Sequence, residues 1–75
     1  MQTVEEAKKQ VIAEVEEALK TTGVRTYGTC ANGEVHGWNM PLHYALSALR
    51  RNPPKGWHIE CHTNWECQDW TITAE

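Results

Sequence analysis

This 75-residue chain lacks phenylalanine, long apolar runs and closely paired cysteines. Without a stretch of about 18 apolar residues, no membrane-spanning helix is expected. Charged residues stand near the start, where a secretion signal needs an apolar segment, so we expect no signal peptide. The three cysteines are an odd number, which favours a reducing compartment over a disulfide framework. Together these absences predict a cytoplasmic protein.

Motifs that carry catalysis or bind nucleotides are also missing. The sequence has no P-loop and no G-x-G-x-x-G. The H-x-E triplet at 58–60 lacks the later P-C-x-x-C of zinc deaminases. His43 and Ser47 lie one helical turn apart on the predicted outer side of a helix, without a recognisable oxyanion hole. Acidic neighbours would make Cys67 a poor nucleophile. We therefore expect a protein that is not an enzyme and needs no cofactor.

Four histidines and three cysteines are candidate metal ligands, but their spacing does not fit structural zinc. Such sites use close pairs of the type C-x₂₋₄-C. Cys61 and Cys67 are too far apart in sequence, and strand alternation predicts them on opposite faces of a sheet. A surface site made by His58 and Glu60, with Asp69 nearby, keeps a metal-binding module as an alternative. The main prediction is that no residue binds metal.

What the chain does contain suits one small α+β domain spanning residues 1–75. Its hydrophobic fraction of 40% is enough for a thin core. The formal net charge of −3 argues against nucleic-acid binding. Residues 57–75 hold four acidic side chains and no lysine or arginine, so this small acidic protein favours a basic partner.

Two segments have the spacing of amphipathic helices. Residues 3–21 begin at the N-cap candidate Thr3 and stop before Gly23. A second helix of about three turns follows residues 39–41 and ends at the prolines of 52–54. The apolar stripes of these two helices are Val4, Ala7, Val11, Val15, Ala18 and Leu19, and Leu42, Ala45, Leu46 and Leu49.

The first predicted hairpin joins strands 24–30 and 34–38 through a turn at 31–33, where Asn and Gly tolerate positive φ. Tyr27 and Arg25 are predicted on its solvent side. The return strand is short and forms an edge, which leaves pairing with a second copy, and hence a homodimer, open.

The second predicted hairpin joins strands 57–62 and 67–73 through a two-residue turn at Asn64-Trp65, with Ile59 opposite Trp70. The order is then helix–hairpin–helix–hairpin. We expect a two-layer α+β fold, in which an antiparallel sheet is packed on one face by both helices and is open to solvent on the other.

Two surfaces are candidate binding sites. The first lies on the second hairpin, where an exposed tryptophan beside acidic groups is typical of an interaction site. This surface indicates that the chain is a small protein that binds or inhibits a larger protein, as the inhibitors of phage and mobile elements do. Its predicted contact residues are Trp65, Glu66, His62, Asp69 and Glu60.

The second surface is a basic cluster at the end of the second helix. It predicts, as the alternative function, a module that captures a nucleotide or another anion, for which arginine offers a bidentate contact. Its residues are Arg50, Arg51 and Lys55.

Overall fold

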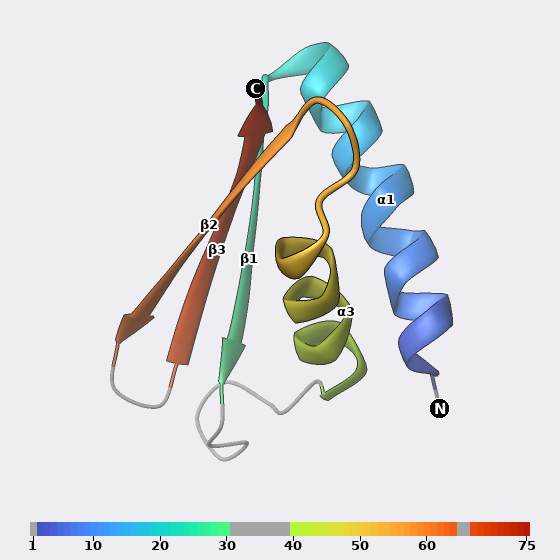
Figure 1. The fold of residues 1–75 in the computed structure, drawn as a ribbon, viewed down its shortest axis with the longest axis vertical. Helices are drawn as coiled ribbons and strands as arrows, with labels where there is room; N and C mark the ends of the chain where they lie inside the picture. Colours follow the sequence, from blue (N-terminus) through green and yellow to red (C-terminus); the bar gives the residue numbers. More distant parts are fainter. Residues whose placement is uncertain (1, 31–39, 65–66) are drawn as a thin grey trace.

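The computed structural model describes residues 2–30, 40–64 and 67–75. This part of the chain forms two helices and three strands, in the order helix, strand, helix, strand, strand (Figure 1). The predicted return strand 34–38 and its turn lie outside the described residues. The elements are α1 (Val4–Thr21), β1 (Val24–Cys30), α3 (Met40–Arg51), β2 (Trp57–Asn64) and β3 (Cys67–Ala74).

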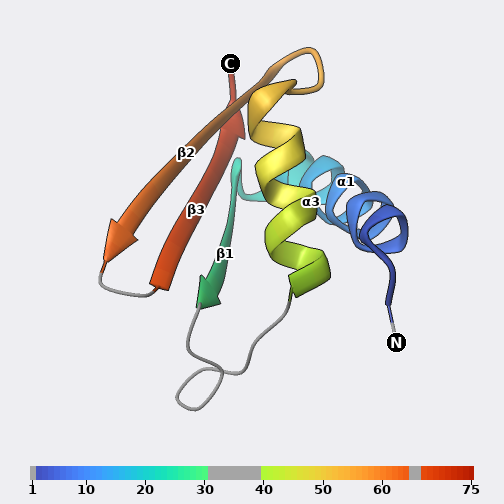
Figure 2. The same ribbon diagram turned by 60° about the horizontal axis from the view of Figure 1, so that its bottom comes forward.

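The described strands form an antiparallel sheet in the order β1-β3-β2. Both helices lie on one face of this sheet, as the two views in Figure 1 and Figure 2 show. The two-layer α+β prediction is therefore confirmed. Within the described ranges, neither helix is long and apolar enough to cross a membrane.

Helix α1 begins and ends where its sequence predicts. Thr3 Oγ1 accepts a hydrogen bond from Glu6 N at 3.1 Å, and Glu6 Oε1 accepts one from Thr3 N at 3.0 Å. This capping box satisfies two backbone donors that the first turn leaves without helical partners. At the other end Gly23 has φ +84°, and its N donates to Ala18 O at 2.8 Å. Glycine reaches this left-handed conformation at no steric cost.

The core lies between the helices and the sheet. Both helical stripes contribute to it, together with alternate residues of β2 and β3. The apolar positions that alternate along β2 and β3 face the helices, as the sequence predicts. The predicted inner face of the second hairpin is therefore confirmed. The buried cluster comprises Val11, Val15, Leu46, Leu49, Trp57, Ile59, Trp70 and Ile72.

The predicted pairing of β2 with β3 is wrong by two residues. Ile59 lies opposite Ile72, and Cys61 lies opposite Trp70. The strands separate after the pair Asn64–Cys67, so the connection is 65–66 instead of 64–65. All residues of β2 can pair in this register, which adds ladder hydrogen bonds. The shift is even, so every side chain keeps its predicted face.

Strand β1 faces the opposite way from the prediction. Arg25 and Tyr27 are half-buried and lie toward α1, whereas Val24 is 40% exposed. The polar atoms of β1 explain this, because Tyr27 donates a hydrogen bond to Glu14 of α1 and the buried Thr29 accepts one from Trp70. Hydrogen bonds thus compensate for burying polar residues in place of valine.

His43 also lies elsewhere than predicted. The sequence places it on the outer side of the second helix, but its Nδ1 is 3.1 Å from Thr29 Oγ1. The same hydroxyl accepts a hydrogen bond from Trp70 Nε1 at 2.9 Å. The Thr29 hydroxyl proton can therefore be donated to Nδ1 of a neutral imidazole. His43 is a structural link between α3 and the sheet.

Candidate interaction face

The side of the sheet away from α1 and α3 presents three rows of residues, and each row contains one residue from each strand. Each row runs across β2, β3 and β1 in the observed register. We call these nine positions the open face, and neither described helix covers them (Figure 2). Its rows are His58–Thr73–Val24, Glu60–Thr71–Thr26 and His62–Asp69–Gly28.

Glu60 lies at the centre of the β2 side of this face. Its Oε1 is 3.1 Å from His58 Nε2, and its Oε2 is 3.6 Å from His62 Nε2. All three side chains are more than half exposed. The hydrogen bond with His58, and then that residue's charge, lowers the pKa of Glu60. The carboxylate therefore stays ionised across the physiological range.

A second acidic residue extends the charge across the sheet. Asp69 of β3 is the register partner of His62 on one side and of Gly28 on the other. A Cβ at Gly28 would lie 3.9 Å from Asp69 Oδ1, which is ordinary van der Waals contact. Without a side chain there, the Asp69 carboxylate has no bulky neighbour from β1 and is exposed.

Three of the five residues predicted to bind a partner are thus brought together. Glu60, His62 and Asp69 lie on adjacent positions of β2 and β3. Trp65 and Glu66 lie outside the described residues, and their part in the site stays a prediction.

The alternative anion site lies at the other end of β2. Arg50 and Arg51 are exposed in the last turn of α3, and Lys55 is exposed in the segment that leads to Trp57. Among the described residues, no carboxylate lies within ion-pair distance of these three side chains. The structure therefore shows three exposed basic side chains here, as the sequence predicts.

Sequence reasoning missed a polar cluster between α1 and β1. Tyr27 Oη donates to Glu14 Oε1 at 2.7 Å, and Arg25 Nη2 lies 3.4 Å from the same oxygen. The Arg25 guanidinium also lies over the Tyr27 ring, 4.7 Å from its centre. The sequence patterns of α1 and β1 do not reveal this contact, because each pattern describes one element and the contact joins two.

Hydrogen bonding and burial change the pKa values of Glu14 and Tyr27 in this cluster. The Tyr27 hydrogen bond lowers the pKa of Glu14. Burial, and then the bond to Glu14, raises the pKa of Tyr27 to about 12. Both shifts favour the state in which a neutral phenol donates to a carboxylate.

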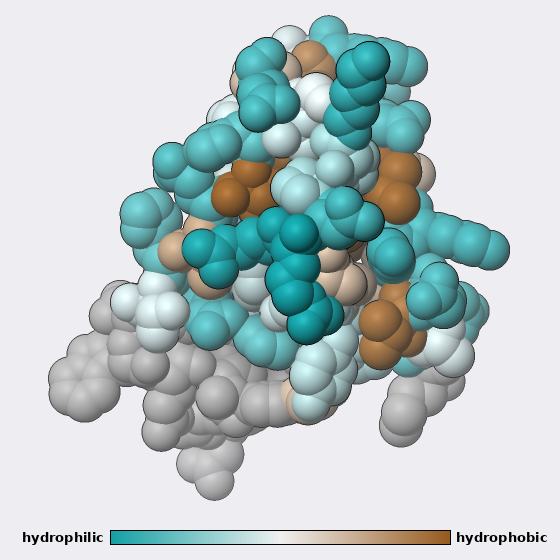
Figure 3. All heavy atoms as spheres, in the orientation of Figure 1, coloured by the Kyte–Doolittle hydropathy of each residue, from teal (hydrophilic) through white to brown (hydrophobic). Residues whose placement is uncertain are grey.

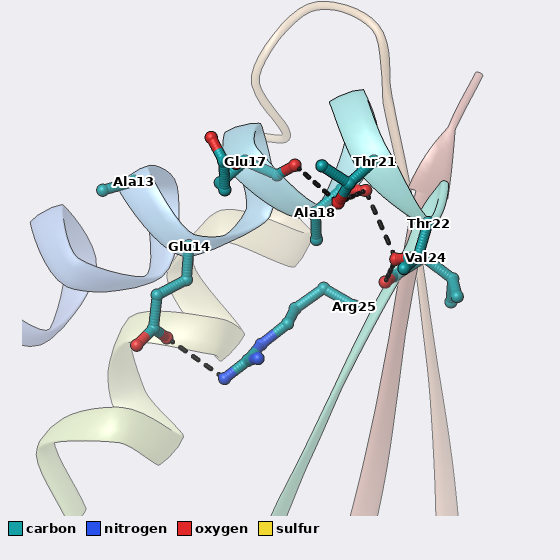
Figure 4. Close-up of a pocket in the computed structure, with 8 residues that line it drawn as sticks. All are labelled: Ala13, Glu14, Glu17, Ala18, Thr21, Thr22, Val24 and Arg25. Atoms are coloured by element: carbon teal, nitrogen blue, oxygen red, sulfur yellow. Dashed lines mark hydrogen bonds and ion pairs between the residues drawn. The ribbon is translucent and has the colours of Figure 1, made fainter.

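Two shallow hollows flank the cluster. One, of about 540 Å³, runs along the end of α1 (Figure 4) and is lined by Ala13, Glu14, Glu17, Ala18, Thr21, Thr22, Val24 and Arg25. The other, of about 230 Å³, lies toward the start of α1 and shares Glu14 and Arg25 with it. Since Glu14 already contacts Tyr27 and Arg25, we interpret the cluster as a structural contact between α1 and the sheet.

The described residues do not assemble a metal site. In these segments no three His, Cys, Asp or Glu side chains converge in a way that could hold an ion. On the open face, Glu60 lies between two histidines that point to different carboxylate oxygens.

Hydrophilic residues cover most of the surface that Figure 3 shows, and the hydrophobic ones form small separate groups. Large hydrophobic side chains that are exposed in the described chain include Val4, Val24 and Tyr44. They belong to three different elements, and Val24 is the one of these three that lies on the open face, so contact through this face would depend mainly on polar groups. Comparison with protein-family models, curated proteins and solved structures found no match.

Proposed function

We propose that this protein binds or inhibits a larger protein, using the open face together with residues 65–66. The partner surface that fits is basic. The observation that carries the proposal is the polar face of the sheet that neither described helix covers, on which Glu60 and Asp69 present exposed carboxylates.

Charge supports this choice of partner. The C-terminal segment 57–75 has four acidic residues and no lysine or arginine. The lowered pKa of Glu60 keeps one of these charges in place below neutral pH. Opposite potentials steer two proteins together and increase the association rate more than the final affinity. The predicted anchor, Trp65, would then supply affinity at the end of the face.

The test begins with capture of the partner from native lysate and measurement of its binding to purified variants. Glu60→Ala and Asp69→Ala should each slow association and weaken its dependence on salt. Trp65→Ala should raise the dissociation constant at least about thirtyfold, which corresponds to about 2 kcal/mol. Arg51→Ala is the control, because Arg51 lies at the opposite end of β2.

The same variants test the anion-binding alternative. If Arg51→Ala abolishes binding while the Glu60, Asp69 and Trp65 variants bind like the parent, the open-face proposal is wrong. The captured species would then be a nucleotide or another anion held by the basic cluster, and its affinity would fall steeply with salt.

A further inference from the structure

The backbone of β2 leaves one side of the strand unpaired in the described structure. Glu75 N donates to Gly56 O at 2.8 Å, which marks this as a hydrogen-bonded pair at the start of the β2–β3 ladder. Pairing alternates along antiparallel strands, so His58, Glu60 and His62 direct their N–H and C=O groups toward β3. The residues between them direct theirs toward the free edge. These are Trp57, Ile59, Cys61 and Thr63.

Only the first of these edge groups has a partner within the described chain. Trp57 N donates to Pro54 O at 3.2 Å. In both ribbon views no described element lies beyond β2, and both helices lie nearer to β1 (Figures 1 and 2). A further strand can therefore approach this edge without meeting either helix.

The sequence of β2 does not protect the edge. Natural sheets discourage edge pairing with lysine, proline, a bulge or a very short strand. Strand β2 is eight residues long and contains no lysine, arginine, proline or glycine. The other outer strand, β1, carries both Arg25 and Gly28. On one face of β2 the side chains are His58, Glu60 and His62, so an antiparallel copy of the strand can place an imidazole opposite each Glu60 carboxylate.

We propose that β2 pairs with β2 of a second copy, antiparallel and about a two-fold axis at Cys61, to form a continuous six-stranded sheet. The backbone groups of this interface lie in the plane of the sheet, apart from the predicted edge at 34–38, but the side chains of Glu60 and His62 belong both to this interface and to the open face. The interface needs no partner protein and does not depend on the proposed function.

Charge and strand length select this register. A two-fold axis at Glu60 would place two carboxylates opposite each other, which is unfavourable. Axes at Ile59 or His62 would leave fewer residues of β2 overlapping. With the axis at Cys61, residues 58–64 all pair, and Glu60 of each copy lies opposite His62 of the other. The outward groups of Ile59, Cys61 and Thr63 then form about six hydrogen bonds between the chains.

Sedimentation velocity over a wide range of protein concentration tests the proposal on the purified chain. The parent should dimerise at high concentration, as a small interface of this kind predicts. Thr63→Pro should raise the dimer dissociation constant at least about tenfold, because proline removes an edge N–H and is compatible with an edge strand. Thr63→Val is the matched control, since it keeps the N–H and should dimerise like the parent.

A charge exchange tests the register and does not depend on the proline variant folding. His62→Glu should weaken the dimer, because the introduced carboxylate faces Glu60 of the other copy. Adding Glu60→Lys to it should restore dimerisation. Repulsion between the introduced carboxylate and Asp69 of the same chain is present in both variants. Repulsion with Glu60 of the same chain acts in monomer and dimer alike, so relieving it does not by itself restore dimerisation.

A parent that stays monomeric at the highest concentration overturns the proposal. So does a folded Thr63→Pro variant that dimerises like the parent, or failure of the double variant to recover. None of these results bears on binding of a partner to the open face.

Discussion

Single hydroxyl groups connect the helices of this protein to its sheet. Tyr27 Oη donates to Glu14 of α1, and Thr29 Oγ1 lies between Trp70 Nε1 and His43 Nδ1. Each contact joins residues that are distant along the chain. A small domain is marginally stable, so losing one such bond is a measurable fraction of its total stability.

The first prediction concerns Tyr27. Tyr27→Phe should lower the free energy of unfolding by about 1 kcal/mol, because it removes one hydrogen bond to a partly exposed carboxylate. Urea denaturation measures this change. Glu14→Gln is the comparison variant, because the Tyr27 phenol can still donate a hydrogen bond to the amide oxygen of the glutamine. A Tyr27→Phe variant as stable as the parent would contradict the observed contact.

The second prediction is the pH dependence of stability. The pKa of Glu14 is lowered from 4.5 in the folded state, so its contribution is present above pH 4.5 and is lost as pH falls further. The pKa of Tyr27 is raised from 10.0 to about 12, so its contribution is present below pH 10 and is lost as pH rises toward 12. Urea midpoints measured across pH should therefore fall at both extremes.

Tyr27→Phe serves as the control for the alkaline arm. It should lack the part of the decline between pH 10 and 12 that Tyr27 causes. An identical alkaline decline in parent and variant would show that other groups cause it.

The third prediction concerns Thr29, which is 4% exposed. Thr29→Val keeps the shape of the side chain but leaves the indole N–H of Trp70 without its acceptor. An unsatisfied buried donor costs about 1–3 kcal/mol. Thr29→Ser retains the hydroxyl and should be closer to the parent in thermal denaturation. Equal stability of the valine variant and the parent would refute this role.

At the scale of elements, helix α3 is held to the sheet by its apolar stripe. Ala45, Leu46 and Leu49 are buried, and Leu46 is 0% exposed. The stripe packs into the same cluster as Trp57 of β2 and Trp70 of β3. Two tryptophans thus supply much of the core volume in a chain without phenylalanine.

The fourth prediction follows from this packing. Leu46→Ala should cost about 2–5 kcal/mol, because it leaves a cavity between α3 and the sheet. Chemical denaturation measures the loss, and a substitution at exposed Arg50 on the same helix is the control. An unchanged melting temperature for Leu46→Ala would mean that α3 packs by another face.

At the scale of the whole molecule, the two proposals meet on β2, because Glu60 and His62 belong to the open face and also pair with each other across the dimer. Partner binding uses the open face, whereas self-association uses the edge of β2 in the plane of the sheet. A dimer formed at this edge would place two open faces side by side. A partner with two basic sites could then bind both, which increases the overall affinity through effective concentration.

The fifth prediction concerns metal. Ligand spacing in the sequence leads us to expect no stoichiometric zinc in the purified protein and no loss of fold in a chelator. Elemental analysis together with circular dichroism before and after chelation measures both. One zinc per chain, with unfolding on its removal, would overturn this expectation.

Local patterns in the sequence were sufficient to predict the helices and most strand positions. The capping box at Thr3 and the stop at Gly23 depend on neighbouring residues only, and the helical stripes depend on a repeat within one element. Alternation along β2 and β3 likewise predicted which residues face the helices. It also placed Glu60, His62 and Asp69 together on the opposite face.

Only the tertiary structure decided how these elements meet. The orientation of β1 was predicted wrongly, because its inward face is polar and becomes favourable only when Glu14 and Trp70 supply partners. The register of β2 was two residues off for a related reason. Alternation determines which face a side chain occupies, but every even shift satisfies it equally well. The observed register is set by the length of ladder that pairs, which is a property of two strands together.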